Sequence, residues 1–278
     1  MPLIFNIKRF SFIFCFLGFL FSGCTKSDDL VSTDIEYKSV TDLYFIDSLL
    51  TETMLNPKDI LVVFDFNYTL MYPTIPCLHK NNIDAHKDIF KKILKKISHE
   101  QADLMLTQLM ATKNQKLIND QLSIFLKKHS DVNFLVCSSS LEKNAEAYLN
   151  LLNKNNITIT NNYNIKNFRF LDFKEYLSGY PIYKNGIITT NRRKKGEVLI
   201  NFLKRISHKP KLIIFIDNSA DKLDDVKLAV KSLKNIKLII VEYSEYKNIP
   251  IPKVSEQKFK KYWNNQVENF LTSQNSSD

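Results

Sequence analysis

Short apolar runs that end in a polar residue dominate the hydrophobic pattern of this chain. Residues 60–64 are apolar throughout and mostly branched or aromatic, and the run ends abruptly at Asp65. Uninterrupted runs of this kind are typical of parallel strands that are buried on both faces. Largely apolar runs also cover residues 132–137, 212–216 and 237–242, and Ile157-Thr-Ile-Thr160 is typical of a short strand. The pattern therefore predicts five strands of a parallel sheet.

Helical periodicity fills most of the sequence between these runs. Apolar residues recur at three-to-four spacing in residues 41–55, and Asn56-Pro57 ends that helix. Ser98 begins a capping box inside a longer helical stretch. Strands that alternate with helices predict an α/β fold. Further helices are expected over residues 84–97, after the capping box at residues 98–101, and over residues 117–126, 141–153, 195–203 and 255–271, with a hairpin over residues 181–189.

The helical stretch after the first strand divides the predicted core. We expect an α/β core made of residues 40–80 and 130–246, with a small helical cap inserted at residues 81–129. Residues 247–278 are expected to form a C-terminal helix and tail. A crossover helix with extra packing is the alternative for the insertion, because the inserted segment is short.

Two of the predicted strands end in a carboxylate. Asp65 follows the first strand and Asp217 ends a later one. Open α/β sheets bind ligands at these strand ends. The strand order predicts that the two residues lie on neighbouring strands, where a divalent cation would offset their repulsion. Oxygen ligands suit magnesium. For Asp65 alone, the alternative is an ordinary capped turn.

The residues after the first strand resemble motif one of the haloacid dehalogenase superfamily. Its phosphatases have the pattern Asp-x-Asp-x-Thr, and this chain has Asp65, Asn67 and Thr69 in those places. Ser138, with Ser139 as the second choice, follows an apolar strand as motif two does. The resemblance implies a Rossmann-like three-layer sandwich with a cap over the site.

Two later segments extend the resemblance, which covers about residues 59–242. Lys195-Gly196 opens a helix as motif three does. Motif four is an apolar strand that ends in paired acids, and this chain has Asp217-Asn218 there, so one acid is lost. The hairpin before Lys195 and the Asp-Asn-x-x-Asp-x-Leu pattern from Asp217 give a finer likeness. That likeness is to the uncharacterised domain-of-unknown-function family 2608.

The resemblance implies a magnesium-dependent phosphatase that acts on a small phosphorylated substrate. Asp65 would attack phosphorus to form an aspartyl phosphate, Ser138 would bind a phosphate oxygen, and Lys195 would neutralise charge. Mg²⁺ would be held by Asp65, the backbone carbonyl of Asn67 and Asp217. Secondary candidates for the site are Asn218 and Asp221.

Asn67 departs from the motif, because the phosphatases carry their general acid and base at this position. An amide cannot donate and recover a proton, and general acid–base catalysis is typically worth about 10²- to 10⁴-fold. Three interpretations are open. The chain is a slow phosphatase, or acts on a substrate that needs no acid there, or is a catalytically inactive module that binds a ligand or protein.

The first residues have the composition of a secretory signal. Lys8 and Arg9 precede an apolar run of about a dozen residues, which is short for a membrane-spanning helix. Ser22, Gly23 and Cys24 then resemble a bacterial lipobox. The resemblance implies a signal peptide over residues 1–23, lipid on Cys24, a tether over residues 24–39 and a cell-envelope protein that faces the periplasm. The alternatives are an uncleaved anchor and an unlipidated signal peptide.

Composition adds few constraints. The formal net charge of +10 favours anionic substrates or anionic lipid head groups. Nucleic acid is not expected as a partner, since no motif interleaves basic and aromatic residues. Cys77 and Cys137 would remain after processing, and unpaired thiols are preferred to a disulfide. The five histidines have no ligand spacing, so they predict no rival metal site.

Overall fold

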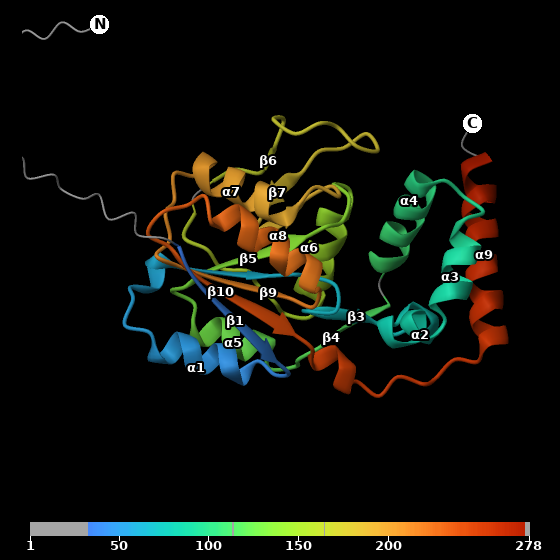
Figure 1. Ribbon diagram of the computed structural model, residues 1–278, viewed down its shortest axis with the longest axis horizontal. Helices are drawn as coiled ribbons and strands as arrows, with labels where there is room; N and C mark the ends of the chain where they lie inside the picture. Colours follow the sequence, from blue (N-terminus) through green and yellow to red (C-terminus); the bar gives the residue numbers. More distant parts are fainter. Residues whose placement is uncertain (1–32, 113, 164, 276–278) are drawn as a thin grey trace, which may run out of the picture. The chain divides into compact units, whose positions relative to one another are not determined.

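The computed structural model describes residues 33–112, 114–163 and 165–275 (Figure 1). The predicted signal peptide, Cys24 and the first part of the predicted tether lie outside the described residues.

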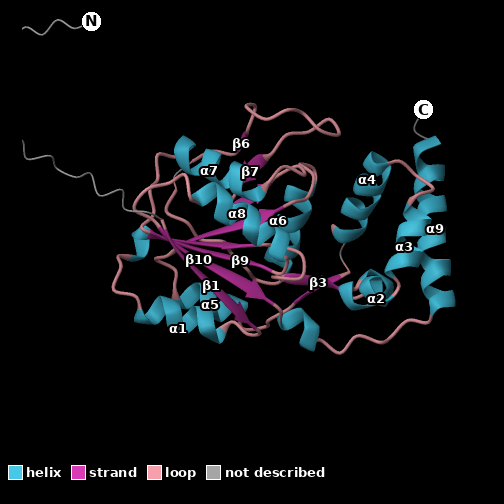
Figure 2. Ribbon diagram, in the orientation of Figure 1, coloured by secondary structure: helices cyan, strands magenta, loops and turns pink. Residues whose placement is uncertain are grey.

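A large, mostly parallel sheet forms the centre of the fold, in the strand order β1-β10-β9-β2-β5-β8-β7-β6 (Figure 2). The first six strands in this order run parallel, and β7 and β6 add an antiparallel edge. Their bounds are β1 Asp34–Val40, β2 Ile60–Phe64, β5 Asn133–Ser138, β6 Phe168–Arg169, β7 Ile182–Lys184, β8 Ile187–Thr189, β9 Leu212–Asp217 and β10 Lys237–Tyr243.

Helices cover both faces of the sheet, which explains why its central strands are apolar without alternation. In β2, Ile60, Val62 and Phe64 pack into one core cluster, while Leu61 and Val63 pack into the opposite one. The first cluster includes side chains of α1 (Tyr44–Glu52), α5 (Leu122–Lys128) and α6 (Asn144–Lys154). The second includes side chains of α7 (Lys195–Arg205) and α8 (Ala220–Val230).

Four of the five predicted strands and the hairpin are present. β2 and β9 are parallel neighbours, as the strand pattern predicts. The β7–β8 hairpin turns through Asn185 and Gly186, whose φ angles of 45° and 85° are both positive. The strand predicted at residues 157–160 is wrong. Thr160 accepts one hydrogen bond from Phe134 N, and β8 takes the regular place beside β5 instead.

β1 is a strand that the apolar pattern does not reveal. Residues 34–39, which the sequence analysis assigns to the tether, pair in parallel with β10. β1 lies at the edge of the sheet, and its residues are exposed or half-buried. An edge strand of this kind needs no continuous apolar run, so its sequence resembles a polar linker.

Four helices form a group beside the sheet (Figure 1). They are α2 (Lys80–Ala85), α3 (Lys87–Leu94), α4 (His99–Met110) and α9 (Glu256–Asn275). We call them the helical module. Their common core contains Met105, Phe259 and Trp263, and the Trp263 indole N–H donates to the carbonyl of Cys77 at 3.2 Å. The module therefore joins the insertion to the C-terminal helix.

The insertion is smaller than residues 81–129. Phe125 of α5 packs on Phe64 and Phe134 of the sheet, so α5 belongs with the core. A two-stranded antiparallel ribbon, β3 (Met71–Pro73) with β4 (Gln115–Leu117), connects the core to the module. Within the described ranges, no helix is both long and apolar enough to cross a bilayer.

Candidate active site

Two buried carboxylates lie at the ends of neighbouring strands. Asp65 follows β2 and Asp217 ends β9, and Asp65 N donates to the Ile216 carbonyl at 2.8 Å. The exposed fractions are 6% for Asp65 and 1% for Asp217. Strand pairing therefore brings together the two acids that the sequence analysis selects.

Lys195 lies between these two acids. It is the first residue of α7 and is 1% exposed. Its Nζ donates to Asp65 Oδ1 at 2.5 Å and to Asp217 Oδ2 at 2.7 Å. One ammonium group thus pairs with two carboxylates, so the buried cluster of Lys195, Asp65 and Asp217 carries a net negative charge.

Burial determines how these groups ionise. It raises the pKa of Asp65 to about 6, although Lys195 acts in the opposite direction. Burial also opposes the charge of Lys195, but Asp217 and Asp65 outweigh it and hold the Lys195 pKa above its usual range. Lys195 is therefore a permanent cation, while Asp65 titrates within an accessible pH range.

Gly196 explains why the Lys-Gly pair opens α7. A Cβ at this position would lie 2.6 Å from Ala229 Cβ and 2.7 Å from the Asp225 carbonyl oxygen. The Gly196 N–H donates to Asp225 Oδ2 at 3.2 Å. Glycine therefore lets α7 approach α8 closely, and this approach seats Lys195 between the acids.

The serine run after β5 forms another wall of the site. Ser138 is 1% exposed, and its hydroxyl donates to Ser140 Oγ at 3.2 Å. Ser140 Oγ is hydrogen-bonded in turn to the Tyr148 hydroxyl. The buried Ser139 hydroxyl has no partner among the described residues. Ser138 and Ser140 are thus linked to a tyrosine that the sequence analysis does not select.

Asn67 connects to the same tyrosine. Its Nδ2 donates to the Tyr148 hydroxyl at 3.1 Å, and the neighbouring Phe66 ring stacks on the Tyr148 ring with centroids 3.8 Å apart. Asn67 Oδ1 is buried without a hydrogen-bond partner. A buried acceptor left without a partner is costly in a protein interior, so it marks a place for a ligand or a cation.

The donor set fits magnesium in its chemistry. Asp65, Asn67 and Asp217 supply oxygen atoms, and magnesium prefers a few protein oxygens plus water. The clustered carboxylates carry more negative charge than Lys195 neutralises. No group of three or more His, Cys, Asp and Glu side chains suited to a metal occurs among the described residues. A cation here would therefore rest on two carboxylates and the oxygens of residue 67.

Nearly all the predicted site residues line one pocket of about 180 Å³. Asp65, Asn67, Ser138, Ser139, Lys195, Asp217 and Asn218 contribute to it. Asp221 does not, because it is exposed in the first turn of α8. Tyr68, Ser140, Ser219, Arg192 and Lys222 also line the pocket and were not selected from the sequence. The signals of the two basic residues are weak, because Arg192 lies in the turn before α7 and Lys222 in the first turn of α8, where basic side chains are usually solvated.

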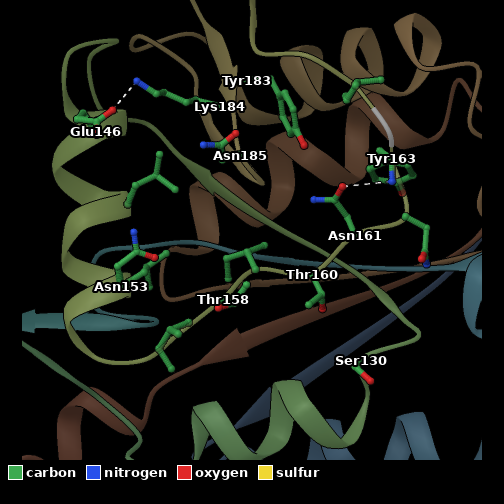
Figure 3. Close-up of a pocket in the computed structure, with 16 residues that line it drawn as sticks. Ser130, Glu146, Asn153, Thr158, Thr160, Asn161, Tyr163, Tyr183, Lys184 and Asn185 are labelled. Carbon is green, nitrogen blue, oxygen red and sulfur yellow. Dashed lines mark hydrogen bonds and ion pairs between the residues drawn. The ribbon is translucent and has the colours of Figure 1, made fainter.

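A larger hollow of about 820 Å³ lies elsewhere, between α6, residues 157–163 with Ile165, and the β7–β8 turn (Figure 3). Its lining includes Asn153, Asn161 and Asn185, and the Lys184–Glu146 ion pair lies across one side. None of the predicted site residues lines it. The chemistry of the small pocket, and not its size, identifies it as the candidate site.

Both cysteines of the described residues are buried and free. Cys77 packs in the helical module, and Cys137 lies in β5 beside the site. Burial raises the pKa of the Cys137 thiol to about 12, so it stays protonated and does not act as a nucleophile.

Comparisons with known proteins give a family and distant relatives. A family model described as "Protein of unknown function (DUF2608)" matches residues 33–275. An uncharacterized protein of Rickettsia bellii is 25% identical over 204 residues, which cover 67% of this chain and 68% of the relative. Uncharacterized proteins of Rickettsia conorii and Rickettsia felis are each 23% identical over 208 residues, or 70% of both chains. No solved structure matches significantly.

Proposed function

Since this chain belongs to the family of proteins of unknown function DUF2608, its activity has to be inferred from its own site, and we propose that it is a haloacid dehalogenase-like magnesium-dependent phosphatase. One observation carries the proposal. The Lys195 ammonium lies within hydrogen-bond distance of both Asp65 and Asp217, at the ends of parallel neighbouring strands. The superfamily resemblance assigns phosphoryl transfer to this arrangement.

Asp65 is the nucleophile in this proposal. Its carboxylate attacks phosphorus, and the bond from phosphorus to the leaving oxygen breaks with the electron pair going to that oxygen. Water then attacks the phosphorus of the aspartyl phosphate, releases phosphate and restores the carboxylate. Lys195 holds Asp65 in place through its 2.5 Å contact and offsets negative charge on the phosphoryl oxygens.

The other site residues would bind the phosphoryl group and Mg²⁺ and orient them. Ser138 lies in the same pocket, and its hydroxyl, which donates to Ser140 Oγ in the structure, would turn to donate to a phosphoryl oxygen instead. Asp65, Asp217 and the oxygens of Asn67 would hold Mg²⁺, which supplies positive charge to the phosphoryl oxygens. This donor set predicts that magnesium raises the melting temperature and that Asp217→Ala removes the rise. An undiminished rise in that variant would place the metal elsewhere.

Asn67 restricts the substrates. Its amide donates to Tyr148 and has no acidic proton for a leaving group. An alkoxide leaving group needs protonation, whereas an aryl or acyl leaving group departs as a stable anion. We therefore expect faster hydrolysis of aryl or acyl phosphates than of alkyl phosphates.

The second candidate function is a catalytically inactive binding module, and the same Asn67 amide favours it. In that case the pocket would hold a phosphorylated ligand without turning it over. Phosphate release from p-nitrophenyl phosphate with magnesium, by the wild type and by Asp65→Asn, separates the two functions. A phosphatase releases phosphate in the wild type only. A binding module releases none in either protein, yet both bind the ester.

We place the protein at the bacterial cell envelope, anchored through lipid on Cys24. The support is the charged, apolar and small-residue order of residues 1–24. Cells fed labelled fatty acid should label the wild type, and Cys24→Ala should abolish the labelling. Equal labelling of both proteins would contradict the anchor.

A further inference from the structure

The candidate site holds more positive charge than the two acids engage. Lys195 is shared between Asp65 and Asp217. Arg192 and Lys222 line the same pocket from two other elements. Lys222 lies in the first turn of α8 and forms no ion pair within the described part of the chain. Lys222 is therefore an unpaired cation at the pocket wall, and Arg192, whose ion pair is with Asp103, is a second cation there.

The backbone that carries Arg192 is strained in a specific way. Asn191 and Arg192 have φ angles of 48° and 66°, in the left-handed region that residues other than glycine rarely adopt. Two backbone hydrogen bonds hold these residues in place. Asn191 N donates to the Ser140 carbonyl at 2.9 Å, and Arg192 N donates to the Ser139 carbonyl at 3.2 Å. Consecutive strained residues persist only where the surroundings impose them, and they cluster at functional sites.

The side chain of Asn191 locks this conformation. It is 1% exposed, and its Nδ2 donates to the carbonyls of Tyr176 and Gly179, both at 2.7 Å. Its Oδ1 accepts from Glu142 N at 3.1 Å. All the side-chain hydrogen-bonding groups of Asn191 are therefore used to hold the turn. The consequence of the turn is that Arg192 lines the pocket beside the serine run.

The guanidinium of Arg192 is only partly engaged. Its Nη2 contacts Asp103 Oδ1 at 3.0 Å and donates to Thr107 Oγ1 at 3.2 Å, both on α4. The contact with the Asp103 carbonyl, at 3.4 Å, uses the same nitrogen. A guanidinium has five N–H donors arranged for a carboxylate or a phosphate, and its other nitrogens have no partner among the described residues.

We propose that Arg192, assisted by Lys222, forms a subsite for a second anionic group on a small phosphate ester. The inference rests on the proposed phosphatase, since Asp65, Lys195 and Ser138 are taken to hold the scissile phosphoryl group. The second group is a carboxylate or a further phosphate, because the planar donors of arginine suit both. Because Arg192, Lys195 and Ser138 line one pocket of about 180 Å³, we expect a few carbons between the two anionic groups of the substrate.

Non-hydrolysable probes test the subsite without requiring turnover. We would measure dissociation constants by calorimetry, with magnesium, for phosphonoacetate, 3-phosphonopropanoate and 4-phosphonobutanoate. Each is paired with the alkylphosphonate of the same length, which carries a methyl group in place of the carboxylate. A charge-assisted contact to arginine predicts that at least one acid binds about tenfold more tightly than its partner.

The neighbouring residue provides a matched control. Arg193 donates to the Lys174 carbonyl at 2.6 Å and does not line the pocket. Arg192→Ala should remove the tenfold preference, and Arg193→Ala should keep it. Lys222→Ala should reduce the preference, whereas Lys227→Ala, on the same helix outside the pocket, should not. Melting curves of each variant separate a loss of binding from a loss of folding.

The outcomes distinguish the subsite from the catalytic proposal. Equal affinities within every probe pair, or a preference that survives Arg192→Ala, would overturn the subsite and leave the phosphatase untouched. If Arg192→Ala lowers only the melting temperature, Arg192 merely joins α4 to the core, and the subsite is equally overturned. A preference that depends on Arg192, found in a protein that hydrolyses no phosphate ester, would support the subsite and reject the phosphatase.

Discussion

The carboxylate end of the sheet and the helical module are built from the sequence in opposite ways. Asp65 and Asp217 follow apolar runs that are complete within a few residues, and parallel pairing of β2 with β9 brings them together. The module combines α2, α3 and α4 with α9, which lies about 150 residues further along the chain. The comparison shows that local sequence pattern determines where the carboxylates of the candidate site lie, whereas contacts between distant segments determine how the helical module is assembled.

The two regions also differ in what their interiors contain. The interior of the site is charged, with three ionisable side chains in mutual contact. The interior of the module is aromatic, and Trp263 packs between Phe90 and Phe259 with centroid distances of 4.6 and 6.2 Å. Substitutions in the first region should therefore respond to pH, and substitutions in the second should not.

We expect the largest loss of stability from Lys195→Met. This change leaves Asp65 and Asp217 buried without a counter-charge, which costs on the order of 3–5 kcal/mol of unfolding free energy. Urea denaturation at pH 8 measures it. The loss should shrink at pH 5, because Asp65, whose pKa of about 6 rises further without Lys195, then takes up a proton. Lys194→Met is the control, because its side chain is 69% exposed. Equal stability of the two variants would contradict the buried charge cluster.

Trp263→Ala should have a comparable effect on the module alone. It empties a buried aromatic site and removes the hydrogen bond to the Cys77 carbonyl, at a cost of about 3–5 kcal/mol. Hydrogen exchange should show the loss of protection in α3 and α9 first. The magnesium-dependent rise in melting temperature should remain, and its disappearance would show that the module and the site are not independent.

The two regions also show which parts of the fold can be predicted from the sequence. β2, β5, β9 and β10 are recognisable because both of their faces are buried, so each strand is apolar at nearly every position. The edge strand β1 lacks that signal, which is why residues 34–39 resemble a tether. The place of α9 in the module depends on contacts that no local pattern contains.

Some residues of the candidate site can likewise be predicted from the sequence, and others cannot. Asp65, Ser138, Lys195 and Asp217 can be selected because each stands at a strand end or a helix start. Tyr148 is a buried residue within α6 and has no such signal. Arg192 enters the pocket only because of a left-handed turn that a non-glycine sequence does not suggest.

Asn67→Asp tests how the site differs from an ordinary phosphatase, and its expected effect is smaller. The new carboxyl group can protonate an alkoxide, so hydrolysis of an alkyl phosphate should rise by about 10- to 100-fold. An aryl phosphate should gain less. The Tyr148 hydroxyl, which now accepts from Asn67 Nδ2, would donate to the carboxylate instead. Unchanged rates on both esters would show that position 67 is not the missing acid.

The smallest effect is the pH dependence of the wild type. In the proposed mechanism Asp65 must be ionised to attack, and burial raises its pKa to about 6. The value of kcat/KM should therefore fall about tenfold per pH unit below the pKa of Asp65, which bound Mg²⁺ would lower from about 6. The free energy of unfolding changes with pH in the opposite direction, because the folded protein binds this proton more tightly than the unfolded chain. Asp65 should thus make the protein less stable as the pH rises from about 4 to 6. The Asp65→Asn variant should lack this contribution.

Phosphorylation of Asp65 is the most direct test of the account. Protein mixed with magnesium and an aryl phosphate is quenched in acid within the first turnover, and its peptides are examined by mass spectrometry. We predict that the peptide containing Asp65 carries a phosphoryl group, and that this mass is absent in Asp65→Asn. Phosphate release in the wild type without an acyl phosphate at Asp65, or release that persists in Asp65→Asn, would contradict the nucleophile that the account assigns.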